Sequence, residues 1–236
     1  MEKRELLFEG SAKRLYSTER DNLAILEFKD DFVDENGGKK TKIPGKGEIN
    51  SGISSFLFQY LENYHVPTHF VERINVTEVL VRRLKMIPIE VVVHNLASTS
   101  LAQRFGIDEG EVLDFPIIEY FLKHPQLGRP MINESHALAL GYARTEDIRA
   151  IGRMASKANA ILKSMFERRG LLLVEFILEF GNVGENIYIG DEISPDTCKI
   201  WDKKRNRKLD KERFLHDLGG VEKAYKELFD RLTRSI

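Results

Sequence analysis

Residues 171–181 read LLLVEFILEFG and residues 190–202 read GDEISPDTCKIWD, and these two stretches say most about the fold. Each is an aliphatic and β-branched run that ends in carboxylates, which is typical of buried strands. We therefore expect two neighbouring strands that deliver acidic side chains to one edge of a sheet.

Glu179 and Asp191 are the acids that this arrangement would bring together. Paired carboxylates at strand ends are a common site for Mg²⁺, which prefers oxygen ligands and takes its remaining ligands from water and nucleotide phosphates. The pattern thus favours an enzyme that uses ATP and Mg²⁺. The alternative, that both are ordinary strand-end acids, stays open on spacing alone.

Composition narrows the class of protein. The chain has 236 residues, long enough for one large domain or two lobes, and its 36 Lys and Arg against 37 Asp and Glu give a net charge of -1. This balance favours neither a nucleic-acid nor a membrane partner. One cysteine, Cys198, and no long apolar run indicate a cytoplasmic protein without disulfides. His65 and His69 are the closest pair of histidines, and the sequence offers no convincing zinc set.

Short strand patterns open the chain at 5–8, 13–17 and 23–28. The turn between the first two contains Gly10, Ser11 and Ala12 and ends at Lys13. Small residues let the backbone approach phosphates, and Lys13 adds a positive charge, so this hairpin is a candidate lid over ATP. An ordinary hairpin is the alternative.

Residues 30–47 lack an apolar period and predict a long loop, whose lysines are either ligand contacts or a solvated charge run: Lys39, Lys40, Lys42 and Lys46. Pro88 stiffens the connection before an apolar strand at 89–93, so we expect a hinge there and two lobes, residues 1–87 and 88–236. Met86, just before it, is suited to lining an adenine slot. The remaining periodicity predicts helices at 54–64, 101–105, 145–169 and 221–232, and strands at 66–71, 78–84 and 116–123.

Read in order, these segments resemble the SAICAR synthetase family. The resemblance covers nearly the whole chain. It is carried by the two stretches quoted first and by FEGSAK (8–13), LEFKDD (26–31), GKGEIN (45–50), PIEVVVHN (88–95), PIIEYFLK (116–123), PMINESHA (130–137) and LDKERFLHDLGG (209–220).

The resemblance implies an α+β fold of two lobes: an antiparallel β lobe that binds nucleotide, related to ATP-grasp and kinase lobes, and a larger α+β lobe, with ATP in the cleft. It implies ATP-dependent amide formation between a carboxylated aminoimidazole ribotide (CAIR) and L-aspartate, giving ADP and phosphate, and a homodimer. Lys13 would contact the phosphates, residues 81–86 (with Val81, Lys85 and Met86) would line the adenine slot, and Glu179 with Asp191 would hold Mg²⁺. The predicted substrate residues are His94, Ser100, Arg104, Lys123, Arg129, Ile177 and Lys199.

Several substrate positions depart from the family pattern. Three cations of the pattern are replaced, at His94, Ile177 and Leu215. A ligand with a phosphate and a carboxylate needs several Arg or Lys groups. Other departures are Ser11 for Lys, Thr99 for Gly, Arg129 for Asp, Glu175 for Asp and Lys199 for Arg.

The sequence therefore predicts a carboxylate–amine ligase of this family. One alternative is a paralogue that joins a different, less anionic carboxylate to an amino acid or other amine, which Ile177 favours because an aliphatic group stands where the reacting carboxylate would be neutralised. Two further alternatives are a non-catalytic nucleotide-binding protein and a small-molecule kinase, which needs only part of the same site.

Overall fold

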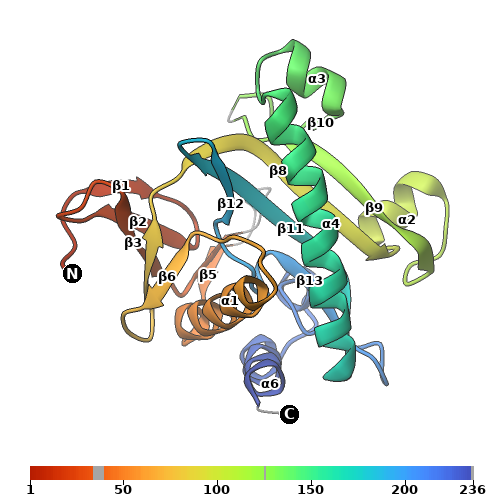
Figure 1. Ribbon diagram of the computed structural model, residues 1–236. Coiled ribbons are helices and arrows are strands. Elements are labelled where there is room, and N and C mark those ends of the chain that lie inside the picture. The colour runs from red at the N-terminus through yellow and green to blue at the C-terminus, as the bar shows by residue number, and fades with distance from the viewer. Residues whose placement is uncertain (34–39, 125, 235–236) are drawn as a thin grey trace.

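The computed structural model describes residues 1–33, 40–124 and 126–234, and within them the chain forms two main antiparallel sheets and a small hairpin (Figure 1). The first sheet has the order β1-β2-β3-β7-β6, with β1 Leu6–Glu9, β2 Lys13–Ser17, β3 Leu23–Phe28, β7 Glu78–Arg82 and β6 Phe70–Arg73. The second has the order β10-β9-β8-β11-β12, with β13 also pairing β11. Its strands are β8 Lys85–Leu96, β9 Val112–Leu122, β10 Met131–Ile132, β11 Leu171–Val183, β12 Asn186–Gly190 and β13 Cys198–Asp202.

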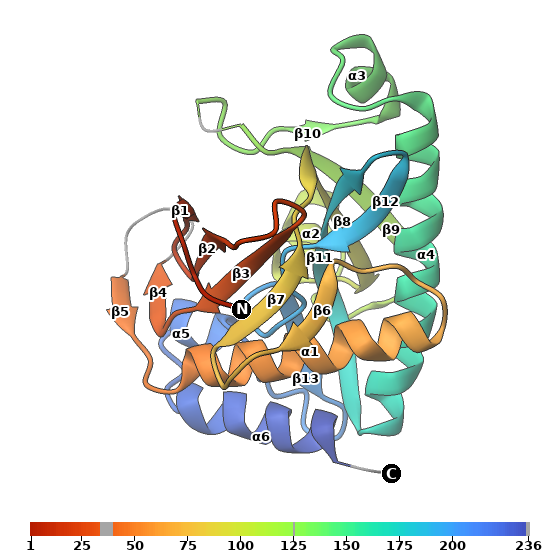
Figure 2. The ribbon, with the colours of Figure 1, turned by 60° about the vertical axis from the view of Figure 1, so that its left-hand side comes forward.

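Helices cover these sheets. They are α1 Lys46–Asn63, α2 Thr99–Phe105, α3 Glu134–Ala139, α4 Thr145–Arg168, α5 Glu212–Leu215 and α6 Val221–Thr233. The two longest are α4 and α1: α4 lies along one face of the second sheet, whereas α1 lies below the first sheet and beside α6 (Figure 2). The predicted α+β class with an antiparallel first sheet is confirmed.

Strands β8 and β11 form the centre of the second sheet, and their side chains alternate between two faces. Val91, Val93 and Leu178 point into the main core together with the α4 residues Ile151 and Ala155. The opposite face carries residues 90, 92 and 94 of β8 and, directly across from them, residues 179, 177 and 175 of β11. We call this second surface the site face; Figure 2 shows the first sheet on its side of the molecule, away from α4.

Helix α1 begins at Lys46, eight residues before the expected start at residue 54. Small residues explain the error, because GKGEINSG reads as a loop. In the structure they permit close packing: a Cβ on Gly47 would lie 2.8 Å from the Phe28 carbonyl oxygen, and one on Gly52 would lie 2.5 Å from the Phe229 ring. Burial of the helix thus outweighs the poor helix propensity of glycine.

The predicted loop at residues 30–47 is therefore only partly correct. It contains the hairpin strands β4 Asp31–Val33 and β5 Lys40–Lys42, and Lys40 and Lys42 are exposed. Lys39 lies outside the described residues. Neither predicted role fits Lys46, whose side chain is 1% exposed and whose Nζ lies 2.5 Å from Asp196 Oδ2.

Pro88 lies inside β8 and not in a connection between strands. The chain passes from β7, in the first sheet, to β8, in the second, through Arg83 and Leu84. The division into lobes at residues 1–87 and 88–236 remains a prediction.

Two glycines let the start of β8 cross closely over β11 and β12. A Cβ on Gly181 would lie 2.8 Å from Leu84 Cβ and 2.9 Å from the Lys85 carbonyl oxygen. A Cβ on Gly190 would lie 3.0 Å from Leu84 Cδ1 and 3.4 Å from Met86 Cε. The side chain of Met86 is therefore held over the strand positions next to Glu179 and Asp191.

We expect Gly181→Ala to lower the free energy of unfolding by about 1–3 kcal/mol, because the added methyl group clashes with backbone as well as with Leu84. Urea denaturation measures the change. Gly152→Ala is the control: its Cβ would meet only the Tyr120 hydroxyl, at 3.3 Å, and alanine favours helix α4. Equal stability of Gly181→Ala and wild type would contradict the close crossing.

Candidate functional site

Lys13 of β2 reaches across to the second sheet. Its Nζ lies 2.6 Å from Asp191 Oδ1 and 2.6 Å from Glu192 Oε1, and the lysine side chain is 14% exposed. Burial opposes the charge on Lys13, but the two carboxylates outweigh burial and raise the pKa of the ammonium group above its usual value. The pKa of Asp191 is lowered, because Lys13 outweighs the effect of burial. The hairpin of β1 and β2 and the predicted metal site thus meet at one ion pair.

The expected single strand at residues 190–202 is wrong. Strand β12 ends at Gly190, a loop spans residues 191–197, and β13 begins at Cys198. Asp191 has φ 58°, in the left-handed region that side chains rarely occupy, and turns the chain out of the sheet. Ser194 then closes a turn in which its hydroxyl accepts from Asp196 N and its carbonyl accepts from Thr197 N.

Glu179 lies within β11 and not at its end, but it is directly opposite Gly190 and so stands beside Asp191. Its Oε1 lies 2.5 Å from Lys123 Nζ. Burial, and then the charge of Asp191, raise the pKa of Glu179 to about 7. The predicted pairing of Glu179 with Asp191 is present in space.

Two such carboxylates suit a divalent cation, because a bound cation would relieve their repulsion and the cost of burying Glu179. Within the described part of the chain, no group of three or more His, Cys, Asp or Glu side chains is arranged to hold a metal ion. The protein would therefore supply two carboxylates, and the other ligands would have to come from water and phosphate, as Mg²⁺ prefers.

The predicted nucleotide-binding residues divide between the turn and the crossing. In the turn, Gly10 N donates to the Lys13 carbonyl oxygen, Ser11 is exposed, and Lys29 N donates to the Ala12 carbonyl oxygen. At the crossing, Lys85 is exposed and Met86 is 43% exposed. Val81 differs from these residues, because its side chain is buried in the main core.

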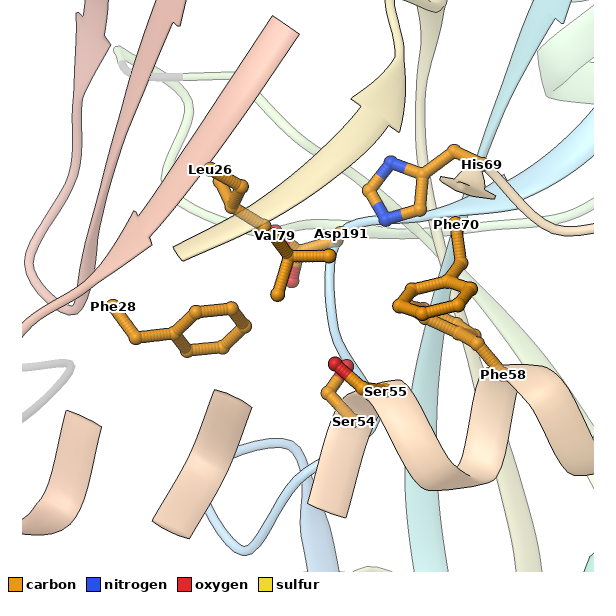
Figure 3. Close-up of a pocket in the computed structure, with 9 residues that line it drawn as sticks. All are labelled: Leu26, Phe28, Ser54, Ser55, Phe58, His69, Phe70, Val79 and Asp191. Atoms are coloured by element: carbon orange, nitrogen blue, oxygen red, sulfur yellow. The ribbon is translucent and has the colours of Figure 1, made fainter. Parts of the chain in front are cut away.

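A small pocket lined by both apolar and polar residues lies between the first sheet and α1 (Figure 3). Asp191 and His69 lie on the same side of it in the figure, above the ring of Phe58. Burial lowers the pKa of His69 to about 4, although Asp191 acts in the opposite direction. A neutral imidazole therefore stands beside the Asp191 carboxylate. The lining residues are Leu26, Phe28, Ser54, Ser55, Phe58, His69, Phe70, Val79 and Asp191.

Three of the predicted substrate residues, His94, Arg104 and Lys199, meet at the other end of the site face, whereas Lys123 and Arg129 pair with Glu179 and Glu90. His94 is 2% exposed, with Nε2 3.1 Å from Glu119 Oε2 and Nδ1 3.2 Å from Glu175 Oε2. Arg104 Nη2 donates to both oxygens of Glu119, at 2.7 Å. Lys199 Nζ lies 3.2 Å from Glu175 Oε2. The cations that the sequence assigned to an anionic substrate are therefore paired with protein carboxylates.

The remaining predicted residues surround these two clusters. Ile177 lies between Glu175 and Glu179 on the site face and is half-buried. Arg129 pairs with Glu90 and lies 4.3 Å from the centre of the Phe121 ring. Ser100, in α2, has its Oγ 3.2 Å from Ser98 Oγ.

Comparison with known proteins places these features in a family. A sequence profile described as SAICAR synthetase matches residues 6–232. The chain is also 47% identical over 236 residues to the phosphoribosylaminoimidazole-succinocarboxamide synthase of Desulfitobacterium hafniense. The aligned region covers 100% of this chain and 99% of that relative. The chain belongs to the SAICAR synthetase family.

Solved structures agree with this membership of the SAICAR synthetase family. The phosphoribosylaminoimidazole-succinocarboxamide synthase of Ehrlichia chaffeensis superposes with a TM-score of 0.94 at 37% identity, covering 98% of this chain and 100% of that one. A SAICAR synthetase solved in complex with ADP also has a TM-score of 0.94, at 41% identity and 97% coverage of both chains. The family resemblance carried by the sequence blocks is confirmed.

Sequence reasoning missed four site residues of this family member. Glu192 was available in the quoted stretch as the neighbour of Asp191, and Glu119 lies in the PIIEYFLK block. Glu90 lies in the PIEVVVHN block. His69 had no signal beyond its residue type, because only the fold brings it near Asp191. No helix in the described part of the chain is long and apolar enough to cross a membrane.

We expect Glu179→Gln to stabilise the protein at high pH. The folded-state pKa of Glu179, about 7, lies above its ordinary value of 4.5, so the wild-type protein loses stability as pH rises between these values. At about pH 8 the variant should gain up to about 3 kcal/mol in free energy of unfolding, and near pH 4.5 the difference should vanish.

Chemical denaturation across this pH range measures the effect. Glu185→Gln is the matched control, because the Glu185 side chain is 88% exposed. If Glu179→Gln is no more stable than the wild type at about pH 8, ionisation of Glu179 does not lower the free energy of unfolding, and the expectation is wrong.

Proposed function

We propose that the protein is an ATP-dependent carboxylate–amine ligase that joins CAIR to L-aspartate, the SAICAR synthetase reaction of purine biosynthesis. The observation that carries the proposal is the meeting of Lys13, Glu179 and Asp191 beside Met86 in a chain of this family. ADP in a relative of 41% identity supports a nucleotide as the ligand of this site.

The chemistry follows from the poor reactivity of a carboxylate. The carboxylate attacks the γ-phosphorus of ATP and releases ADP, and the amine then displaces phosphate from the acyl phosphate to form the amide. Such a reaction requires the protein mainly to position and neutralise charges. Lys13 is the proposed phosphate ligand, since its ammonium group is already held where two carboxylates meet. A bound phosphate would replace one of these carboxylates as the partner of the Lys13 ammonium group.

Glu179 and Asp191 are the proposed ligands of Mg²⁺. When bound there, such a cation would neutralise phosphate charge that develops during transfer. The protein's own contribution is the fixed separation of the two carboxylates, held by the pairing of Glu179 with Gly190. Lys123 lies close to Glu179 and adds a second cation beside the transferred group.

The nucleotide base is proposed to lie against the crossing of β8. Lys85 and Met86 are exposed there, and Gly10, Ser11 and Ala12 form the turn before Lys13. Val81 is the weakest of the proposed contacts, because its side chain already packs in the core.

At the other end of the site face, Arg104 and Lys199 are the proposed contacts for the anionic part of CAIR, with Ser100 in the same helix as Arg104. Ile177 is proposed to meet the middle of the substrate, and Arg129, which pairs with Glu90, the end near Glu179. The paralogue with another carboxylate is less well supported, because the chain aligns over its full length with a relative named for the CAIR reaction. The protein is proposed to act as a homodimer, on the family resemblance alone, and in the cytoplasm, on its single cysteine and the lack of a long apolar run in the sequence.

ADP release should require ATP, Mg²⁺, CAIR and L-aspartate together, and omission of any one should reduce it to background. Asp191→Asn should lower the rate by about 10²–10³-fold, as expected when one preorganised charge is lost. ADP release with CAIR but without any amine would instead indicate a kinase. No release in the complete mixture, with ATP still bound, would favour another carboxylate or a non-catalytic role.

Removal of Mg²⁺ by a chelator should weaken ATP binding by about tenfold, because phosphate and the carboxylate pair then repel each other. Isothermal titration calorimetry measures the affinity. Asp191→Asn should reduce this dependence on Mg²⁺, whereas Asp114→Asn, at an exposed position of β9, should leave it unchanged. Equal ATP affinity with and without Mg²⁺ would contradict the assignment of the metal site.

A further inference from the structure

The site face presents three successive cross-strand pairs between β8 and β11. Glu90 faces Glu179, Val92 faces Ile177, and His94 faces Glu175. Strand geometry separates the first pair from the third by about 13 Å. A charged end, an apolar middle and a second charged end thus follow one another, which suits a ligand that reacts at one end and carries an anion at the other.

His94 lies between two carboxylates. His94 Nε2 makes a hydrogen-bond contact with Glu119 Oε2 at 3.1 Å. Nδ1 lies 3.2 Å from Glu175 Oε2, which is an ion-pair distance, but it makes no hydrogen bond with the residues that the structure describes. The ring therefore stands between two carboxylates, and their negative charges favour its protonated form.

The charges around the ring come from four elements. Glu119 lies on β9 and Glu175 on β11. Arg104 of α2 pairs with the first, and Lys199 of β13 pairs with the second. The charges of these four groups sum to zero, so the protonation state of His94 sets the net charge of the cluster. Three further ion pairs extend from this cluster. Lys199 Nζ also lies 3.5 Å from Glu212 Oε1. Glu212 pairs in turn with Lys208, and Lys208 pairs with Glu109, which is more exposed.

Arg104 is the group through which this charge reaches a ligand. Its side chain is 34% exposed, whereas Glu119 is 8% exposed and His94 is 2% exposed. When His94 is charged, both His94 and Arg104 pair with Glu119, so the positive charge of the guanidinium is only partly neutralised and can attract an anionic ligand. When His94 is neutral, Arg104 is the only one of the two that is a cation, and Glu119 neutralises it more fully.

We propose that His94 is a positioning residue that stays protonated between Glu119 and Glu175 and, through Arg104, makes binding of the anionic end of the carboxylate substrate depend on pH. The inference rests on the proposed function. Burial opposes the charge on His94, but the two carboxylates outweigh burial and raise the pKa of the ring, which favours its charged form. Burial alone would raise the pKa of Glu175, yet His94 and Lys199 lower it to about 2, so this partner stays ionised.

Two measurements test the proposal. In the unmodified protein, NMR titration of isotope-labelled histidine should show the His94 ring charged at about pH 7. Steady-state kinetics should show that KM for CAIR rises about tenfold on going from neutral pH through the His94 titration, while KM for ATP changes little.

Variants separate charge from structure. His94→Gln should raise KM for CAIR about tenfold at neutral pH and remove its pH dependence, whereas His94→Arg should keep KM low at high pH because its charge is permanent. His216→Gln, at an exposed position at the end of α5, is the matched control and should behave as wild type.

The outcomes are distinct. A neutral His94 ring at about pH 7, or a KM for CAIR that does not change with pH while CAIR supports ADP release, would overturn the inference alone. Absence of ADP release with CAIR at every pH would overturn the proposed function, and this inference with it. The NMR titration needs no activity and no variant, so it stands even where His94→Gln fails to fold.

Discussion

The ion pair of Lys13 with Asp191 and Glu192 is the constraint on which the site depends. A lysine this far from solvent needs an anionic partner, because an unpaired buried charge costs several kcal/mol. The two carboxylates come from the loop after β12, whereas the lysine comes from the second strand of the chain. One ammonium group therefore attaches the first sheet to the second and holds Asp191 beside Glu179.

The same balance of charge recurs along the site face. Lys123 pairs with Glu179, Arg129 with Glu90, and Arg104 with Glu119, so each acid on this face has a cation beside it. Such pairs are partly exposed, and their interaction in water is modest. A phosphate, a carboxylate or a divalent cation can exchange for one member of a pair at small net cost. We interpret this surface as a preformed set of exchangeable ion pairs.

Elements with a strong local pattern were predicted well. The expected helix at 145–169 is α4, and the expected strands at 13–17 and 23–28 match β2 and β3. The prediction failed where tertiary packing outweighs local preference. Helix α1 starts among glycines and serines because the first sheet and Phe229 approach it closely. The stretch at 190–202 reads as one apolar run, but Asp191 and the turn at Ser194 divide it into two strands.

The amino-acid sequence by itself determined the family and the class of fold, and it predicted that Glu179 and Asp191 lie close together, because strand patterns and collinear motifs are local in the chain. Only the tertiary structure decided which charges meet. Lys13 pairs with an acid 178 positions away, Lys46 with one 150 positions away, and His94 with one 25 positions away. No local pattern encodes such partners, since the path of the backbone between them sets both their distance and their burial. This is why Lys46 was interpreted as a loop charge, and His94 as a substrate contact in place of an arginine.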